Sequence, residues 1–302
     1  MDNLTHSLVG ALMGQAGLKK KTGLGMPALI IGANLPDVDA ACFFWLEGTE
    51  HLGFRRGITH GPPAMVLLPL ILAGLLWGFD RWQAKRGKRP EDRLPVHFGW
   101  LFGLSLIGCL SHPAFDWFNV YGIRLLEPFS SQWFYGDTLF IIDVWLWAIL
   151  IVSVWWSRRR EKRGGDWQRA AWIGAAIGSV YIFANWVITK VEENATLEQT
   201  GMTSIESPLA INSWERETII RERSGVYRIE GNSVGHCDIG FLDEAELSSQ
   251  AEAFVFWSRT PFGVRAEDGS VILHDARFYD PRARGRFSVA LPDVECEELP
   301  AE

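Results

Sequence analysis

The sequence predicts a mainly α-helical polytopic membrane domain at residues 1–190, followed by a small β-rich extracytoplasmic domain at 191–302. Two observations lead to this prediction. Almost all long uncharged runs lie in the first part, which carries 19 Lys and Arg against 14 Asp and Glu. The second part is acidic, with 10 Lys and Arg against 22 Asp and Glu. The overall charge of −7 gives no support to nucleic-acid binding.

Uncharged runs predict the membrane-embedded helices. A bilayer core requires about 20 apolar helical residues. The four candidate spans are 61–79, 94–115, 144–157 (with 138–143 as an extension) and 170–189. Two shorter runs, 3–18 and 22–36, predict a helical hairpin. Buried helices of a large soluble core are the alternative, but four such runs would leave little amphipathic surface.

Three clusters of basic residues predict the orientation. They lie at 19–21, 81–93 and 158–169. Positive charge near membrane spans favours the cytoplasmic side. We therefore expect a multi-pass protein of the bacterial inner (cytoplasmic) membrane, whose other helix ends and acidic domain are extracytoplasmic.

The acidic part predicts β-structure after a helical linker. Residues 226–229 and 253–257 are predicted strands, and 263–273 predict a hairpin that turns at Asp268-Gly269. Cys237 and Cys296 both lie in this part. An oxidising compartment permits a disulfide between them, and two free thiols are equally compatible with the sequence.

Histidine and aspartate residues gather at the predicted extracytoplasmic helix ends. His112 and Asp116 are four residues apart, so on a helix they share one face and could bind one ion. Ionisable groups at the end of an apolar span are costly and usually functional. The predicted metal ligands are His6, Asp37, Asp39, His60, His112, Asp116, Asp137 and Asp143.

Most of these residues also have a structural interpretation. A pair such as His112 and Asp116, taken alone, is more often a surface or capping contact. Asp37 or Asp39 could cap a helix, His60 could be an interfacial hydrogen-bonding histidine, and His6 could be incidental. Asp143 could ligate, orient a ligand histidine or cap. As a set, imidazole and carboxylate ligands suit Zn²⁺, Mn²⁺ or Fe²⁺. The number of ligands indicates one or two ions, which would activate water for hydrolysis.

The same residues resemble the YdjM-like family of inner-membrane metal-dependent hydrolases, often described as LexA-regulated. The similar segments are Thr5-His6-Ser7, Asn34-Leu35-Pro36-Asp37-Val38-Asp39, Arg56-Gly57-Ile58-Thr59-His60, Ser111-His112-Pro113-Ala114-Phe115-Asp116, Tyr121-Gly122, Pro128-Phe129-Ser130, 137–143, Trp257-Ser258-Arg259 and Asp275-Ala276-Arg277. The resemblance implies a hydrolytic reaction and no substrate. One departure is Arg55, which stands where the family tends to have a histidine.

A remoter resemblance is to the zinc-dependent phospholipase C and S1/P1 nuclease group. His6, Asp37 or Asp39, His60, His112 and Asp116 follow the order of that group's zinc ligands. This resemblance implies phosphoester chemistry, with Asp116 as a candidate bridging ligand.

The sequence thus predicts a metal-dependent hydrolase that acts on a phosphoester or lipid-like substrate at the outer membrane interface. Asp37, Asp116 and Arg56 are the predicted catalytic residues, and Arg55, Arg56 or Arg124 could hold an anionic headgroup. The expected partners are the lipid bilayer and a phospholipid or phosphoester substrate. The alternative is a non-enzymatic membrane protein, either a metal-ion transporter or a scaffold for the acidic domain.

Overall fold

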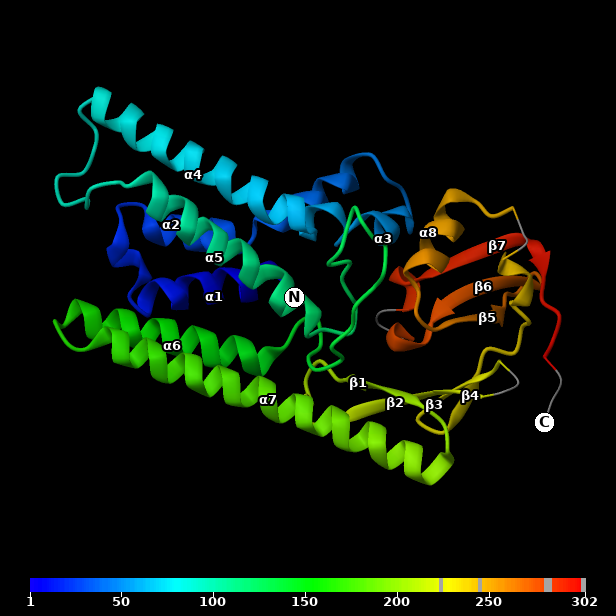
Figure 1. Ribbon diagram of the computed structural model, residues 1–302. Helices are drawn as coiled ribbons and strands as arrows, with labels where there is room; N and C mark the ends of the chain where they lie inside the picture. Colours follow the sequence, from blue (N-terminus) through cyan, green and yellow to red (C-terminus); the bar gives the residue numbers. More distant parts are fainter. Residues whose placement is uncertain (223–224, 244–245, 280–283, 300–302) are drawn as a thin grey trace. The chain divides into compact units, whose positions relative to one another are not determined.

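In a computed structural model, the chain forms two compact units (Figure 1). The structure describes residues 1–222, 225–243, 246–279 and 284–299. The first unit comprises Met1–Val38, Arg56–Val187 and Ala210–Ser213. The second comprises Asp39–Arg55, Ile188–Leu209 and Trp214–Glu302. The boundary expected at residue 190 falls inside a long helix that contributes to both units.

The first unit is helical, as the uncharged runs predict. Its helices among the described residues are α1 (Asn3–Gln15), α2 (Gly25–Gly32), α4 (Pro62–Lys85), α5 (Phe98–Trp117), α6 (Val144–Lys162) and α7 (Trp167–Thr200). The hairpin expected from the two N-terminal runs consists of α1 and α2, which pack against each other. A 3₁₀ segment, Leu35–Phe44, follows α2.

Among the described residues, three helices are long and apolar enough to cross a membrane: α4, α5 and α7. The count reaches four if α2 and the 3₁₀ segment Leu35–Phe44, which meet at a bend of 50°, form one broken span. The predicted span at 144–157 is a helix, α6, but three arginines follow Ser157 directly, so its apolar part is shorter than a full span.

The three basic clusters meet at one end of the first unit. Lys19, after α1, pairs with Glu161 near the end of α6 at 2.6 Å. Its ammonium group also lies 4.4 Å from the ring centre of Trp167, the first residue of α7. On the other side, Thr22 contacts the loop between α4 and α5 through the carbonyl of Pro95. The opposite ends of the same helices carry the histidine and aspartate residues.

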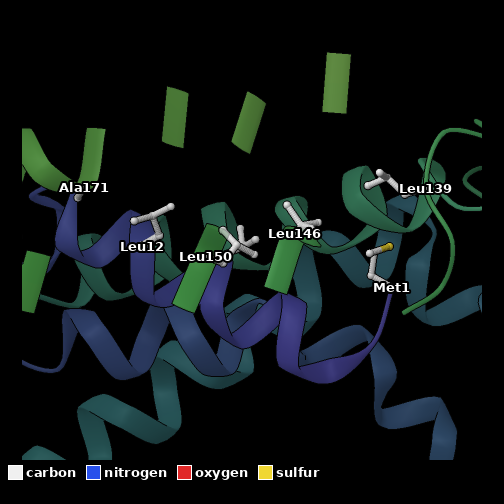
Figure 2. Close-up of a cluster of buried hydrophobic side chains, with 7 residues drawn as sticks. Met1, Leu12, Leu139, Leu146, Leu150 and Ala171 are labelled. Carbon is white, nitrogen blue, oxygen red and sulfur yellow. The ribbon is translucent and has the colours of Figure 1, made fainter. Parts of the chain in front are cut away.

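An apolar cluster joins α1, α6 and α7 (Figure 2). Leu12 of α1 packs with Leu146 and Leu150 of α6 and with Ala171 of α7, and all four are buried. A second cluster joins α2, α4 and α5. These two clusters leave outward apolar side chains such as Leu75 and Val180 exposed, as expected for helices that face lipid.

Glycines bring α1, α2 and α5 unusually close. A Cβ atom at Gly10 of α1 would lie 2.7 Å from the carbonyl oxygen of Leu29 in α2, and one at Gly108 of α5 would lie 2.6 Å from the same oxygen. Neither helix could approach α2 this closely with a larger residue. Gly10 is one turn after His6 and Gly108 one turn before His112, so this contact sets the spacing between the two histidines.

The second unit contains two antiparallel sheets among its described residues. The first has the order β1 (Ser204–Pro208), β2 (Arg216–Arg221), β3 (Tyr227–Ile229) and β4 (Asn232–Val234). The second has the order β5 (Pro261–Arg265), β6 (Ser270–Asp275) and β7 (Ser288–Glu295). Two helices of this unit, α3 (Glu50–Phe54) and α8 (Ser249–Trp257), pack together. β3 and the β5–β6 hairpin confirm two of the predicted β-segments.

The strand predicted at 253–257 is wrong, because these residues form the end of α8. Ser248 caps the helix by accepting a hydrogen bond from the backbone N–H of Ala251. Ala251, Phe254 and Trp257 are buried at helical spacing. The aromatic and β-branched composition favoured a strand, but the capping serine and the three-residue spacing of buried positions decide for a helix.

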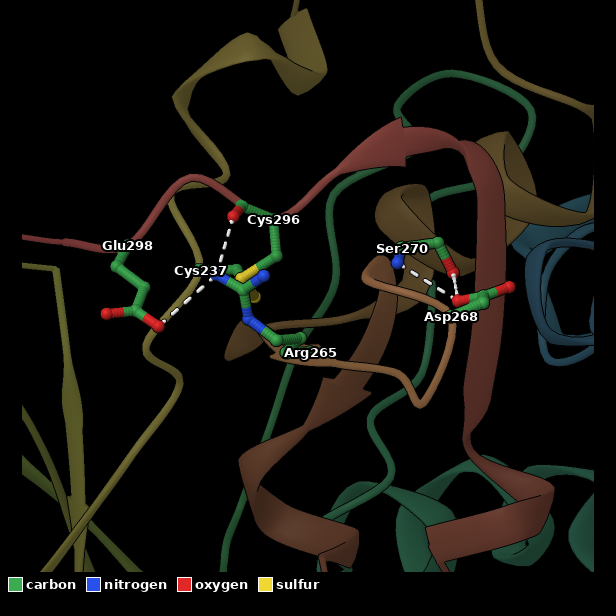
Figure 3. The surroundings of a disulfide bond; sticks show 6 residues. All are labelled: Cys237, Arg265, Asp268, Ser270, Cys296 and Glu298. Carbon is green, nitrogen blue, oxygen red and sulfur yellow. Dashed lines mark hydrogen bonds and ion pairs between the residues drawn. A yellow bond between two sulfur atoms is a disulfide. The ribbon is translucent and has the colours of Figure 1, made fainter.

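Cys237 and Cys296 form a disulfide, which decides between the two alternatives that the sequence left open. Figure 3 shows its surroundings, where Arg265 donates to the carbonyl of Cys296 at 3.0 Å and pairs with Glu298 at 3.2 Å. Cys42 and Cys109 are buried thiols, as expected.

A buried ion pair lies beside β6. Asp275 accepts hydrogen bonds from Ser258, Thr260 and Arg277. Burial raises the pKa of this carboxyl group. The adjacent guanidinium and the hydrogen bonds lower the pKa by more, so the net shift is downward.

Candidate metal centre

Five predicted site residues converge at one end of the first unit. His6 lies in the first turn of α1, and His60 lies two residues before the start of α4. His112 and Asp116 lie in the last turns of α5, and Asp37 follows α2. The helices alternate in direction, so these helix ends meet. The predicted i,i+4 arrangement of His112 and Asp116 on one helix is confirmed.

Asp116 is at the centre of this group and is fully buried. Its Oδ1 atom lies 3.3 Å from Nε2 of His6 and also accepts from the α-amino group of Met1. Its Oδ2 atom lies 3.5 Å from Nε2 of His112 and 3.6 Å from Nε2 of His60. The two carboxylate oxygens therefore face different histidines.

The orientation of His112 identifies which of its nitrogens is available. Nδ1 lies 2.7 Å from the carbonyl oxygen of Ala33, so it must carry the proton and donate. In the neutral imidazole, Nε2 presents a lone pair toward Asp116 Oδ2, an acceptor that also lies 3.2 Å from Nε of Arg56. A divalent cation between Nε2 of His112 and Oδ2 of Asp116 would accept both lone pairs. The donation from Nδ1 to a backbone carbonyl is the usual support of a metal-ligating histidine.

The spacing of the ligand atoms fits a tetrahedral ion. Two ligand atoms that each lie about 2.1 Å from a tetrahedral Zn²⁺ are separated by about 3.4 Å. The Nε2–oxygen separations at Asp116 are 3.3, 3.5 and 3.6 Å, and that between His112 and Asp37 is 3.8 Å. Among the described residues, the groups able to hold an ion are His6–Asp37–His112 and His60–His112–Asp116.

His6 is held against His112. Their rings stack with centroids 3.8 Å apart, and neither ring nitrogen of His6 makes a hydrogen bond. Burial lowers the pKa of His6 to about 4, with the neighbouring His112 adding to the shift, so its imidazole is neutral at pH 7.

Arg56 is fixed beside the carboxylate by several contacts. Its Nε lies 3.2 Å from Asp116 Oδ2, and its Nη1 donates to Asn119 Oδ1 at 2.9 Å and to the carbonyl of Gly122 at 3.2 Å. The guanidinium lies 4.4 Å from the ring centre of Tyr121. Its backbone has a φ of 55°, a left-handed conformation that is uncommon for a non-glycine residue.

The structure places the other predicted ligands outside both groups. Asp39 belongs to the second unit, where its Oδ1 lies 3.5 Å from Nε of Arg55. Asp137 is buried in the first unit with a φ of 47°. Asp143 caps α6 by accepting from the backbone N–H groups of Trp145 and Leu146, and it also accepts from the hydroxyl of Tyr181. Capping was one of the three roles considered for Asp143.

Sequence reasoning missed two supports of the site. Asn119 orients Arg56, and the α-amino group of Met1 contacts Asp116. The sequence signal for Asn119 was its position three residues after Asp116, at the end of a predicted span. The contact of Met1 depends on how α1 begins, and no residue pattern reports that.

Together, the apolar helices and the buried histidine–aspartate cluster define a helical membrane protein with a candidate metal site at one end of its helical unit. Residues 1–191, more than half of the chain, match the family described as YdjM inner membrane protein, and the chain belongs to that family. The resemblance of the sequence to this family is thereby confirmed.

One curated relative is "Uncharacterized protein YfhP" of Bacillus subtilis (strain 168). It is 26% identical over 167 residues, which is 52% of this chain and 47% of that protein. The chain thus spans about half the length of the curated relative it matches. No solved structure matches the chain.

Proposed function

We propose that the protein is a membrane-bound metal-dependent hydrolase whose ion is held by His60, His112 and Asp116. The observation that carries the proposal is the convergence of His112 Nε2 and His60 Nε2 on Asp116 Oδ2, at 3.5 and 3.6 Å, with all three side chains buried. Two imidazoles and a carboxylate are a ligand set of catalytic zinc sites, which keep one position open. Zn²⁺ fits best, and Mn²⁺ or Fe²⁺ are alternatives.

The cluster favours one ion per chain. Both ligand groups use His112, whose Nδ1 is occupied by the carbonyl of Ala33, so only Nε2 remains for a metal. A second ion would need Asp116 to bridge through Oδ1 toward His6. We propose the Oδ2 side as the primary site, because it brings two histidines to one oxygen.

The residues around the ion have distinct proposed roles. A divalent ion in this position supplies Lewis acidity toward a phosphoryl or carbonyl oxygen and lowers the pKa of water. Asp37 Oδ1, 3.8 Å from His112 Nε2, would accept the proton of the attacking water. Arg56 would bind the anionic group of the substrate through its guanidinium. Asp37 is 9% exposed, more than the other cluster residues, so substrate would approach from its side.

A phosphoester or lipid-like substrate suits this arrangement. Arg56 places a positive charge beside the proposed metal ligands, and this charge would complement a phosphate group. The cluster also lies at the ends of apolar helices, where lipid headgroups are found. We propose that this end faces the outer membrane interface, because the basic clusters lie at the opposite end. A metal-ion transporter would bury ionisable groups near the middle of several spans, whereas this cluster is terminal.

A hydrolysis assay with purified protein in detergent tests the proposal. Fluorogenic phosphodiester and phospholipid substrates should be cleaved by the Zn²⁺-loaded protein and not after chelation. Asp37→Asn should retain the ion and lose about 100-fold or more in kcat, because only the proton acceptor is removed. Full metal loading without cleavage of any phosphoester or ester tested would contradict the hydrolase.

A further inference from the structure

A groove runs between α1 and α6 toward the basic end of the first unit, away from the metal cluster. We define this α1–α6 groove by its apolar wall and its basic rim. The wall consists of Leu8, Ile151, Val154 and Trp155, and the rim of Arg158, Arg159, Lys162 and Arg163. Its volume is about 690 Å³. A second hollow of about 280 Å³, lined by residues that include Ala11, Met26 and Ile30, shares Val154 and Arg158 with it.

The polarity of the groove changes along the helix axis. Ile151, Trp155, Arg158 and Lys162 follow one another at spacings of four, three and four residues, so they lie on one face of α6. The first part of this face is apolar and the last part is cationic. A soluble amphipathic helix separates the two kinds of residue around its circumference instead. A ligand that lies along this face must have an apolar end and an anionic end.

The part of the chain that the structure describes does not neutralise the cations of the rim. Within the residues that the structure describes, Arg158, Arg159, Lys162 and Arg163 form no ion pair with a carboxylate. The neighbouring carboxylate, Glu161, is engaged by Lys19 at 2.6 Å. The Arg159 guanidinium lies 5.4 Å from the ring centre of Trp155, a residue type that favours the headgroup layer. The rim therefore offers four positive charges to one anion.

We infer that the α1–α6 groove binds an anionic phospholipid, with an acyl chain along Leu8, Ile151 and Val154 and the phosphate at the rim. Basic pockets between helices at the membrane surface recognise such headgroups. The lipid is a resident of this end of the bundle rather than the substrate, because the rim and the metal cluster belong to opposite helix ends. Since Leu8 of α1 lines the groove together with residues of α6, the bound lipid contacts both helices and stabilises their packing.

The test compares lipids added to the purified protein in detergent. Phosphatidylglycerol should raise the melting temperature and remain bound in native mass spectrometry, whereas phosphatidylcholine should do neither. Arg159→Gln/Lys162→Gln should weaken phosphatidylglycerol binding by about 30-fold, since each basic residue near an anionic headgroup contributes about fivefold. Val154→Trp, which fills the groove and keeps every charge, should also reduce binding.

The matched control is Arg86→Gln/Lys88→Gln, which removes two exposed charges from another basic cluster and should leave lipid binding unchanged. An equal loss in this control would overturn the groove as the site, because net charge alone would then govern binding. An equal rise in melting temperature with inorganic phosphate would show an anion site without a lipid. An equal effect of phosphatidylcholine would overturn headgroup recognition.

Discussion

At the scale of single residues, the site depends on which atoms are left without hydrogen bonds. His112 donates through Nδ1 to the backbone carbonyl of Ala33, so its Nε2 faces the cluster. Asn119 and Gly122 hold Arg56 so that its Nε faces Asp116. Residue types and spacing predicted His6, Asp37, His60, His112 and Asp116 as one group. They could not separate these from Asp39 and Asp143, because capping and ligation use the same carboxylate and only the fold shows which donors each one meets.

Arg56→Gln is expected to separate substrate binding from metal binding. The guanidinium is not a ligand, so the variant should retain its ion. Loss of a charged hydrogen-bond donor to an anionic substrate should lower kcat/KM by about 10- to 100-fold. Arg55→Gln, whose native side chain pairs with Asp39 in the second unit, is the control and should have a smaller effect. Loss of the ion in Arg56→Gln would refute the role assigned to Arg56.

At the scale of elements, close helix packing positions the ligands. Gly10 and Gly108 let α1 and α5 approach the same carbonyl of α2, and the His6 and His112 rings stack one turn away. The uncharged runs predicted these helices, because apolar length is visible in a sequence. The helix α8 was missed because its aromatic residues suit a strand equally well, and the capping Ser248 was the sequence signal that favoured a helix.

Gly108→Ala is expected to disturb the site without changing any ligand. The added methyl group would lie 2.6 Å from the Leu29 carbonyl oxygen, so α5 must move, at a cost of about 1–3 kcal/mol. Melting temperature and bound metal should both fall. Gly103→Ala on the same helix is the matched control, since no atom lies within 4 Å of its Cβ position. Equal behaviour of the two variants would show that helix spacing does not set the site.

At the scale of the whole molecule, charge and chemistry separate to opposite ends of the helical unit. Lys19, Glu161 and Trp167 meet at one end, and the histidines meet at the other. The sequence predicted this separation through the positive-inside rule. It did not predict that residues 39–55 join the second unit, because this depends on contacts between segments about 200 residues apart. One such contact is the hydrogen bond that the Thr49 hydroxyl donates to the backbone carbonyl of Gln250.

The opposite ends of the helical unit predict the side of the membrane on which the C-terminus lies. We expect the acidic unit on the side of the metal cluster, because α4, α5, α6 and α7 alternate in direction after the α1–α2 hairpin, and four passes return the chain to the side on which α4 begins. A C-terminal alkaline phosphatase fusion should therefore be active in cells, and a C-terminal green fluorescent protein fusion should be dark. The reverse pair of results would refute the extracytoplasmic location of both the acidic unit and the site.

The most direct test of the metal centre is the metal content of the detergent-purified protein, measured by elemental mass spectrometry beside its melting temperature. The wild type should carry about one divalent ion per chain, and His112→Ala and Asp116→Ala should lose it and melt at lower temperature, because the ion ties α4 and α5 together. His97→Ala and His274→Ala, which lie outside the cluster, should retain both properties. Full metal content in the His112→Ala and Asp116→Ala proteins would contradict the metal centre and remove the main support for a hydrolase.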